Sequence, residues 1–424
     1  MQYKDSTKPV RQIARELQVD AIVEGAVARS GSRVTITVQL IDATQDRHIW
    51  ARKYDRQAED LLDIEAEVSR EIANQIGGTL AARRIVRGSE IRAVDSETYE
   101  LCLLGRFHWN KRTAADLAKS ADYYQQAITR DPNYAPAYAG LANAYALMPS
   151  YDSVAMQATY AKGTAAARRA IDLDHRLAEP YATLGVIELN DGGWQRAGAE
   201  LQHALELNPN LATAHQWLAY YLVFSGQINE AIAEMESARR LGPLSAVINA
   251  DEGQLLYVAR RYGEATIRLR QAIELAPDNG QAYETLALTD LETRDPTDAI
   301  KEAQDGLALS LTSPRTLGES GYVLARTGHA AEARGLLRTL NGMALHDSGR
   351  PVYLAMIYVG LNRPQQALKQ LQLQAKTFGG LEGVWQWHAF DEQRHDPRYQ
   401  ELITAGDVAS SKRDSRALSA GAGH

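Results

Sequence analysis

Residues 178–209 read AEPYATLGVIELNDGGWQRAGAELQHALELNP, and this stretch contains the pattern on which the fold depends. Its second half carries Ala197, and an alanine then recurs at 34-residue steps, at Ala231, Ala265, Ala299, Ala333 and Ala367. A repeat of this length is one helix–turn–helix unit that cannot bury its apolar face alone, so that neighbouring units must stack. The sequence therefore predicts a solenoid of paired helices.

Further positions share this register. Seven residues after the alanines stand Ala204, Ala238 and Ala272, and twelve residues before them stand Gly185, Ala219, Gly253, Ala287, Gly321 and Ala355. Small residues at fixed points allow two helix backbones to cross closely. Pro209, Pro243 and Pro277 are expected to end second helices, because proline lacks the backbone donor and clashes with the preceding turn.

The combined pattern of small residues, alanines and prolines resembles the tetratricopeptide repeat over residues 178–378. Upstream, Asn133–Ala142 opens another repeat and Ala127–Pro132 closes an earlier one, which gives about eight repeats in all. The resemblance implies a mainly α fold, a right-handed α-α superhelix, preceded by a small and incomplete α/β domain.

The amino-terminal residues follow a different pattern. Val10, Ile13, Ala14 and Leu17 share one helical face, and residues 61–76 are expected to form a second amphipathic helix. Between them lie three strand candidates, 20–29, 33–42 and 47–54, and the Ser30-Gly31-Ser32 stretch joins the first two as a hairpin. In the second strand Val34, Ile36, Val38 and Leu40 alternate with polar residues, which predicts one buried and one solvated sheet face.

Segments 11–17, 23–25, 39–42 and 49–55 resemble the TolB-like amino-terminal domain, and residues 387–391 and 396–399 resemble the carboxyl ends of the same group of bacterial signalling proteins. In those relatives the domain begins with another strand and helix, and a class III nucleotide cyclase or a winged-helix DNA-binding domain lies further upstream. This chain starts at Met1 with neither. A partner supplies the first strand, the domain tolerates its loss, or the chain is a truncated regulator.

The sequence thus suggests five parts. They are a partial TolB-like domain (1–82), a linker (83–98), the repeat solenoid (99–378), a carboxyl-terminal capping segment (379–404) and a disordered tail (405–424), which is rich in Ser, Ala and Gly.

Composition narrows the function classes. The 424-residue chain has a net charge of −7 and no basic stripe, which argues against nucleic acid as a direct ligand. With a single cysteine, Cys102, it forms no internal disulfide. Because neither an apolar signal core nor a membrane-length apolar run occurs, we expect a soluble cytoplasmic protein without a membrane segment.

No catalytic pattern stands out, and we expect no enzyme, no metal and no cofactor. Cys102 lies in an apolar helical run, which favours a buried structural thiol over a nucleophile. His388, Asp391 and His395 have a metal-like helical spacing, but solvent-exposed polar residues are the favoured interpretation. Asp290 is expected to be a surface or groove charge.

The remaining site candidate is the concave groove lined by first helices, where tetratricopeptide arrays bind extended or helical peptides. Tyrosine rings and amides suit peptide recognition, although each tyrosine could equally pack between helices. By register the groove includes seven candidates: Asn143, Gln216, Tyr220, Gln254, Tyr257, Glu284 and Tyr322.

Two functional hypotheses follow. The first is a non-catalytic scaffold that binds a protein or peptide partner in the groove, in bacterial signalling. The alternative is the regulatory part of an adenylate cyclase or transcriptional regulator whose effector is missing or separately encoded, which rests on the family resemblance alone.

Overall fold

The structure is a computed structural model of the 424-residue chain, and it describes residues 8–17, 19, 21–30, 33–42, 47–57, 67, 96–151, 156–191, 194–311, 313–343, 350–378 and 388–402. The predicted helix at 61–76, the linker 83–98, the residues 379–387 and the tail 405–424 lie wholly or almost wholly outside the described residues.

The amino-terminal residues form one helix and a three-stranded antiparallel sheet, as predicted. Helix α1 (Val10–Leu17) precedes β1 (Ala21–Ser30), β2 (Arg33–Asp42) and β3 (Arg47–Gln57), and the strand order is β1-β2-β3. Val34, Val38 and Leu40 are buried, which confirms the predicted alternation. An irregularity in the β2–β3 register at Leu40/Ile41 allows Ile41 to be buried as well, which strict alternation would not allow.

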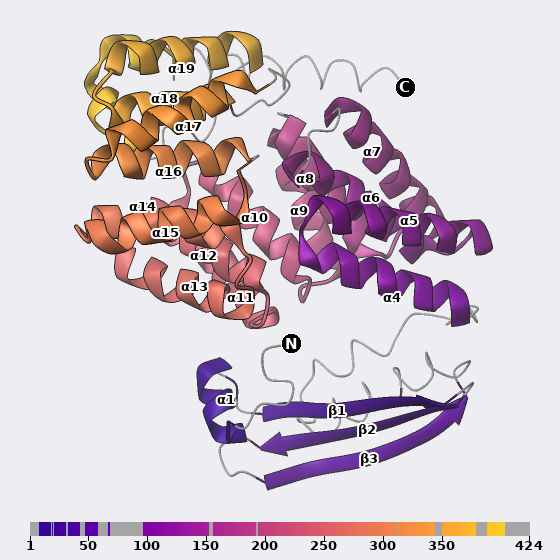
Figure 1. Ribbon diagram of the computed structural model, residues 1–424. Helices are drawn as coiled ribbons and strands as arrows, with labels where there is room; N and C mark the ends of the chain where they lie inside the picture. The colour runs from indigo at the N-terminus through magenta and orange to yellow at the C-terminus, as the bar shows by residue number, and fades with distance from the viewer. Residues whose placement is uncertain are drawn as a thin grey trace, which may run out of the picture. The chain divides into compact units, whose positions relative to one another are not determined.

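The rest of the described chain is helical, and its helices follow one another in pairs (Figure 1). Their bounds are α4 (Ser96–Lys111), α5 (Ala114–Arg130), α6 (Ala135–Tyr151), α7 (Met156–Leu173), α8 (Ala178–Asp191), α9 (Trp194–Leu207), α10 (Ala212–Phe224), α11 (Ile228–Leu241), α12 (Ala246–Val258), α13 (Tyr262–Leu275), α14 (Gly280–Glu292), α15 (Pro296–Leu309), α16 (Pro314–Arg326), α17 (Ala330–Gly342), α18 (Arg350–Gly360) and α19 (Pro364–Phe378). Two 3₁₀ turns follow, η3 (His388–Phe390) and η4 (Glu392–His395).

The helix starts reproduce the repeat. The second helices α9, α11, α13, α15, α17 and α19 each begin 34 residues after the one before, at residues 194, 228, 262, 296, 330 and 364. First helices of successive repeats also touch, because α8 contacts α10 and the helices α12, α14, α16 and α18 contact in turn. The described helices therefore form eight pairs, α4–α5 to α18–α19, in a mainly α solenoid.

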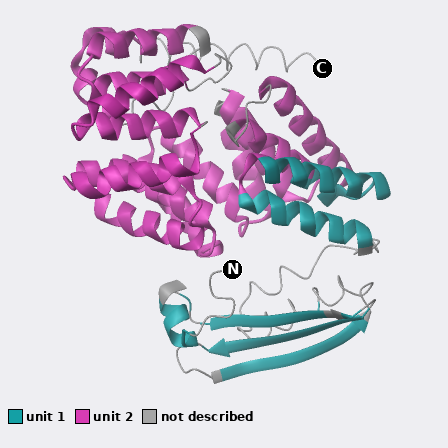
Figure 2. Cartoon of the chain, in the orientation of Figure 1, with its two compact units in different colours: residues 1–111, 115–140 teal, residues 112–114, 141–424 magenta. Residues whose placement is uncertain are grey.

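The described chain divides into two compact units (Figure 2). Residues 1–111 and 115–140 make up the first unit, and residues 112–114 and 141–424 the second. The five-part division and its boundaries remain a prediction.

The spaced alanines lie where the pattern predicts, at the closest contacts between helices. Ala197, Ala231, Ala265, Ala299, Ala333 and Ala367 all have no exposed surface. The small residues upstream are equally constrained. A Cβ on Gly253 would come within 2.5 Å of Leu269 Cγ, and one on Gly185 within 2.6 Å of Leu201 Cγ. A larger side chain at either glycine would force the two paired helices apart.

Helix ends combine expected and unexpected signals. Pro209, Pro243 and Pro277 stand two residues beyond the ends of α9, α11 and α13, as predicted. The turns between the paired helices share a left-handed residue at 34-residue intervals: Gly226, Arg260, Arg294, Gly328 and Asn362. This conformation closes a helix end and normally favours glycine, so the two arginines conceal the repeat of the turn in the sequence.

The close approach at Gly253 predicts a measurable cost of one methyl group. Gly253→Ala should lower the free energy of unfolding by about 1–2 kcal/mol, because overpacking against the fully buried Leu269 outweighs the gain in helix propensity. Gly263→Ala in exposed α13 is the control, since nothing lies within 4 Å of its added Cβ, and it should stabilise by about 0.4–1 kcal/mol. Urea unfolding followed by circular dichroism measures both. Equal midpoints for the two variants would contradict the close packing.

Candidate functional site

Polar side chains link the first helices of neighbouring repeats in the second unit. We call them the polar row, and they are Asn143, Thr183, Gln216, Asp251, Gln254, Gln281, Glu284, Thr285, Arg315, Thr316 and Glu319. At the amino-terminal end of the row, the hydroxyl of Thr183 on α8 hydrogen bonds to Asn143 Oδ1 on α6. Because a buried polar group is costly unless it is hydrogen-bonded, these links fix which helices meet.

Asp251 is the centre of the first cluster in the row. Gln216 donates to its Oδ2 from α10, and Gln281 Nε2 donates to its Oδ1 from α14 at 2.7 Å. The Tyr220 hydroxyl also hydrogen bonds to this carboxyl, while Gln281 Nε2 lies 3.1 Å from Gln254 Oε1. Burial nonetheless raises the pKa of Asp251, because the cost of desolvating its charge exceeds what these neutral donors return.

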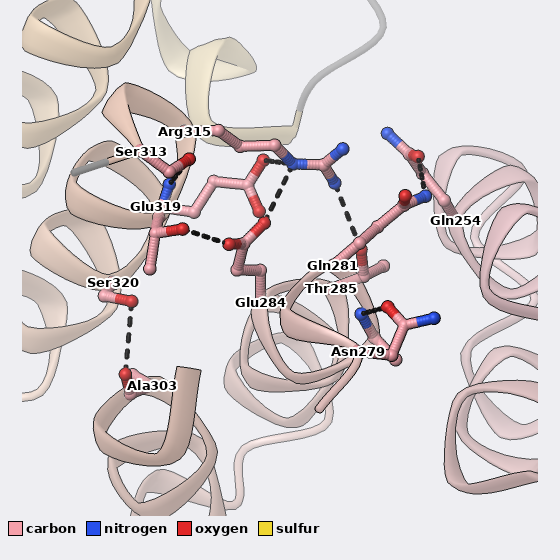
Figure 3. Close-up of polar contacts among 12 residues, drawn as sticks. Gln254, Asn279, Gln281, Glu284, Thr285, Ala303, Ser313, Arg315, Glu319 and Ser320 are labelled. Carbon is pink, nitrogen blue, oxygen red and sulfur yellow. Dashed lines mark hydrogen bonds and ion pairs between the residues drawn. The ribbon is translucent and has the colours of Figure 1, made fainter. Parts of the chain in front are cut away.

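Arg315 is the centre of the second cluster (Figure 3). Its Nε lies 3.0 Å from Glu284 Oε2 on α14 and 2.9 Å from Glu319 Oε1, one turn further along α16. Thr316 donates to the other oxygen of Glu284. Figure 3 shows both carboxyl groups turned towards the same guanidinium.

Two carboxyl groups competing for one cation make this cluster sensitive to protons. Burial raises the pKa of Glu319 to about 8, Arg315 opposes that rise and Glu284 adds to it. Glu319 Oε2 is buried without a hydrogen-bond partner among the described residues, which leaves the charged form incompletely compensated.

The structure brings five of the seven predicted groove residues into or beside the polar row. Asn143, Gln216, Gln254 and Glu284 belong to it, and Tyr220 reaches it through Asp251. Gln216 and Glu284 are buried, whereas the other three are half-buried and retain exposed surface.

Tyr257 and Tyr322 lie elsewhere. Both are 5% exposed, and both belong to the apolar core that also contains Ala389 and Phe390 of the carboxyl-terminal residues. For these two tyrosines the packing interpretation holds, because their rings have almost no surface on which a ligand could rest in this conformation.

Sequence reasoning missed Asp251, Gln281, Arg315 and Glu319. The signal was present, since Thr183, Asp251, Thr285 and Glu319 occupy one repeat position, at multiples of 34 residues. Trp217 interrupts that series. Gln281 and Arg315 are likewise 34 residues apart.

Two other interpretations of single residues were wrong. Asp290 is 5% exposed and therefore not a surface charge, and burial raises its pKa to about 6. His388 is buried, whereas exposed polar residues were expected there. Hydrophobic packing of the carboxyl-terminal residues against the repeats, which no local pattern shows, accounts for His388.

Little in the described part of the chain supports catalysis. Burial raises the pKa of Cys102 to about 12, so its thiol stays protonated and is a poor nucleophile. Within the described ranges, no group of three or more His, Cys, Asp or Glu residues is placed to hold a metal ion. No described helix is long and apolar enough to cross a membrane.

No family model matches the chain. A protein of Rhizobium meliloti (strain 1021) that carries the provisional name adenylate cyclase 3 is 34% identical over 139 residues, which are 33% of this chain and 24% of that protein. The chain thus spans about a quarter of the length of the curated relative that it matches.

Solved structures of repeat proteins are also similar. PilF of Pseudomonas aeruginosa is 25% identical, with 49% of this chain and 95% of PilF covered and a TM-score of 0.37. YrrB, described as a TPR protein with an unusual peptide-binding site, is 18% identical, with 46% and 97% covered and a TM-score of 0.32. The 34-residue helix spacing and the buried alanines of this chain show the tetratricopeptide-repeat fold directly.

The raised pKa of Glu319 predicts a pH dependence of stability. Between the ordinary glutamate pKa of 4.5 and about 8, folded Glu319 holds a proton that the unfolded chain has released, so stability falls as pH rises through this window. Glu319→Gln keeps a neutral side chain at every pH. The urea midpoint of this variant should therefore fall less between pH 5 and pH 8 than that of the wild type.

The control for this comparison is Glu332→Gln, which alters an exposed glutamate on α17. Its midpoint should follow the wild type across the same pH range. If Glu319→Gln also followed the wild type, Glu319 would be titrating as an ordinary carboxyl group.

Proposed function

We propose that the chain is a non-catalytic scaffold that binds a peptide or protein partner along its first helices, at the polar row. The observation that carries this proposal is the row itself, in which amide and carboxyl groups of neighbouring repeats are held in fixed positions by hydrogen bonds. Such groups can satisfy a peptide backbone without first being ordered, which lowers the entropic cost of binding.

Half-exposed members of the row are the ones that a partner would contact first. Tyr220 offers ring area, and Gln254 and Asn143 offer amide groups that both donate and accept. A tyrosine beside amides is a common composition of peptide-binding surfaces, because aromatic rings contribute area at low entropic cost.

Peptides selected from a random phage-displayed library on the full-length chain provide the test. Tyr220→Ala/Gln254→Ala should weaken binding of the selected peptides by about tenfold or more, measured by fluorescence anisotropy, because both side chains present exposed surface at the row.

The matched control is Tyr181→Ala/Gln366→Ala. Tyr181 packs edge-on against His203 of the second helix α9, and Gln366 is exposed on α19, so this variant should bind like the wild type. Equal loss in both variants, or no loss in either, would place the binding surface elsewhere.

A regulatory role in cyclic nucleotide signalling is the second candidate, and the observation that favours it is the 34% identity to the Rhizobium meliloti protein. The resemblance of residues 11–55 to the TolB-like domain points in the same direction. In this proposal the chain acts on a cyclase as partner and makes no cyclic nucleotide alone.

Purified relative from Rhizobium meliloti tests this role. Adding the full-length chain should change its rate of cAMP formation from ATP at least about twofold, whereas the chain alone should form none. Addition of heat-denatured chain is the control. An unchanged rate at saturating concentrations would remove the regulatory proposal and leave the scaffold proposal untouched.

A further inference from the structure

Residues 388–395, which we call the carboxyl-terminal segment, bind back onto repeats that lie far earlier in the chain. Their polar contacts reach residues 126 to 131 positions upstream, around the carboxyl end of α12 and the start of α13. Phe390 anchors the segment, since it is fully buried in the core cluster that also contains Tyr257 and Tyr322.

His388 is held at three sides by this surface. Its Nε2 lies 3.3 Å from the Val258 carbonyl oxygen and its Nδ1 3.1 Å from the Tyr262 hydroxyl. Because a carbonyl oxygen only accepts, Nε2 carries the proton and Nδ1 accepts from Tyr262. The ring lies 4.5 Å from the Tyr257 ring centroid and meets Tyr262 edge-on. Burial and Arg260 lower the pKa of His388, which keeps the imidazole neutral, as this arrangement requires.

Three residues later, Asp391 provides a charged contact. Its Oδ2 lies 2.5 Å from Arg260 Nη2, and Arg394 lies 3.1 Å from its other oxygen. Arg260 is the left-handed residue of the α12–α13 turn, and its side chain is half exposed. Glu392 is 3.8 Å from Arg326 at the end of α16, which extends the contact two repeats along the array.

We propose that the surface formed by Tyr257, Val258, Arg260 and Tyr262 is a peptide-recognition site for a ring followed three residues later by a carboxylate, and that the chain's own segment fills it in this structure. The inference rests on the proposed scaffold function and deepens it by naming the chemistry of the ligand. Partners would share the arrangement of His388 and Asp391 and would displace the segment.

The geometry favours recognition over simple capping. Aromatic rings that enclose an imidazole, a carbonyl acceptor and an arginine–carboxylate pair select both ends of a short motif, in the manner of a bound peptide. A tethered segment has an effective concentration on the order of mM, so a free peptide competes only when the cis contacts are weakened.

The experiment uses a fluorescein-labelled synthetic peptide with the sequence of residues 386–396, QWHAFDEQRHD, and the full-length chain. His388→Ala/Asp391→Ala removes the polar contacts of the segment and keeps the Phe390 anchor. This released variant should bind the peptide with micromolar affinity in fluorescence anisotropy, at least tenfold more tightly than the wild type does. Peptides with alanine in place of the histidine or the first aspartate should lose that binding.

Two further measurements separate release from misfolding. Arg260→Ala changes a half-exposed side chain on the receptor side, so it should leave the urea midpoint within error and speed hydrogen exchange of residues 388–395. When combined with the released variant it should abolish peptide binding. His175→Ala/Asp278→Ala, which alters two exposed residues, is the matched control and should bind the peptide no better than the wild type.

A released variant whose segment exchanges faster but which does not bind the peptide would overturn the proposal. So would unchanged exchange in both the released variant and Arg260→Ala, because the segment would then be a fixed part of the core. The library-selected peptides of the scaffold test are not used here, so failure of either proposal is seen separately.

Discussion

Close contact between helix backbones is the constraint on which this structure depends. It requires residues without bulk at three points of every repeat, and the alanines spaced by 34 residues meet it with no exposed surface. Gly253 and Gly185 show how little space remains, because even a methyl group would meet the facing leucine at 2.6 Å or less. The identity of the large residues is freer, since packing tolerates changes among them when the total volume is kept.

This dependence explains which features could be predicted. Helix pairs, their spacing, the hairpin and the buried face of β2 all follow from local periodicity, and the structure contains each of them. The left-handed turns were not predictable, because Arg260 and Arg294 take a conformation that glycine signals. The burial of His388 depends on contacts across more than 120 residues, which no periodic pattern records.

The polar row shows a similar division. Amides and tyrosines were recognisable as candidates, but their connections were not, because Asp251 accepts from α10 and α14 at once. The repeat register would have shown the shared position of Asp251, Thr285 and Glu319, although not that Arg315 lies between two carboxyl groups. A buried ionic cluster of this kind adds little net stability, since desolvation offsets the attraction, and its contribution is specificity of which helices meet.

The two ends of the second unit therefore place different demands on a ligand. Around Tyr220 and Gln254 the side chains are half exposed and already fixed, so that binding there needs little rearrangement. Around Tyr257 the same type of side chain is covered by His388, and any ligand must first replace contacts that the chain makes with itself. Because a displaced segment remains tethered nearby, it competes continuously, and only a ligand that reproduces both the ring contact and the Arg260 contact gains enough to exclude it.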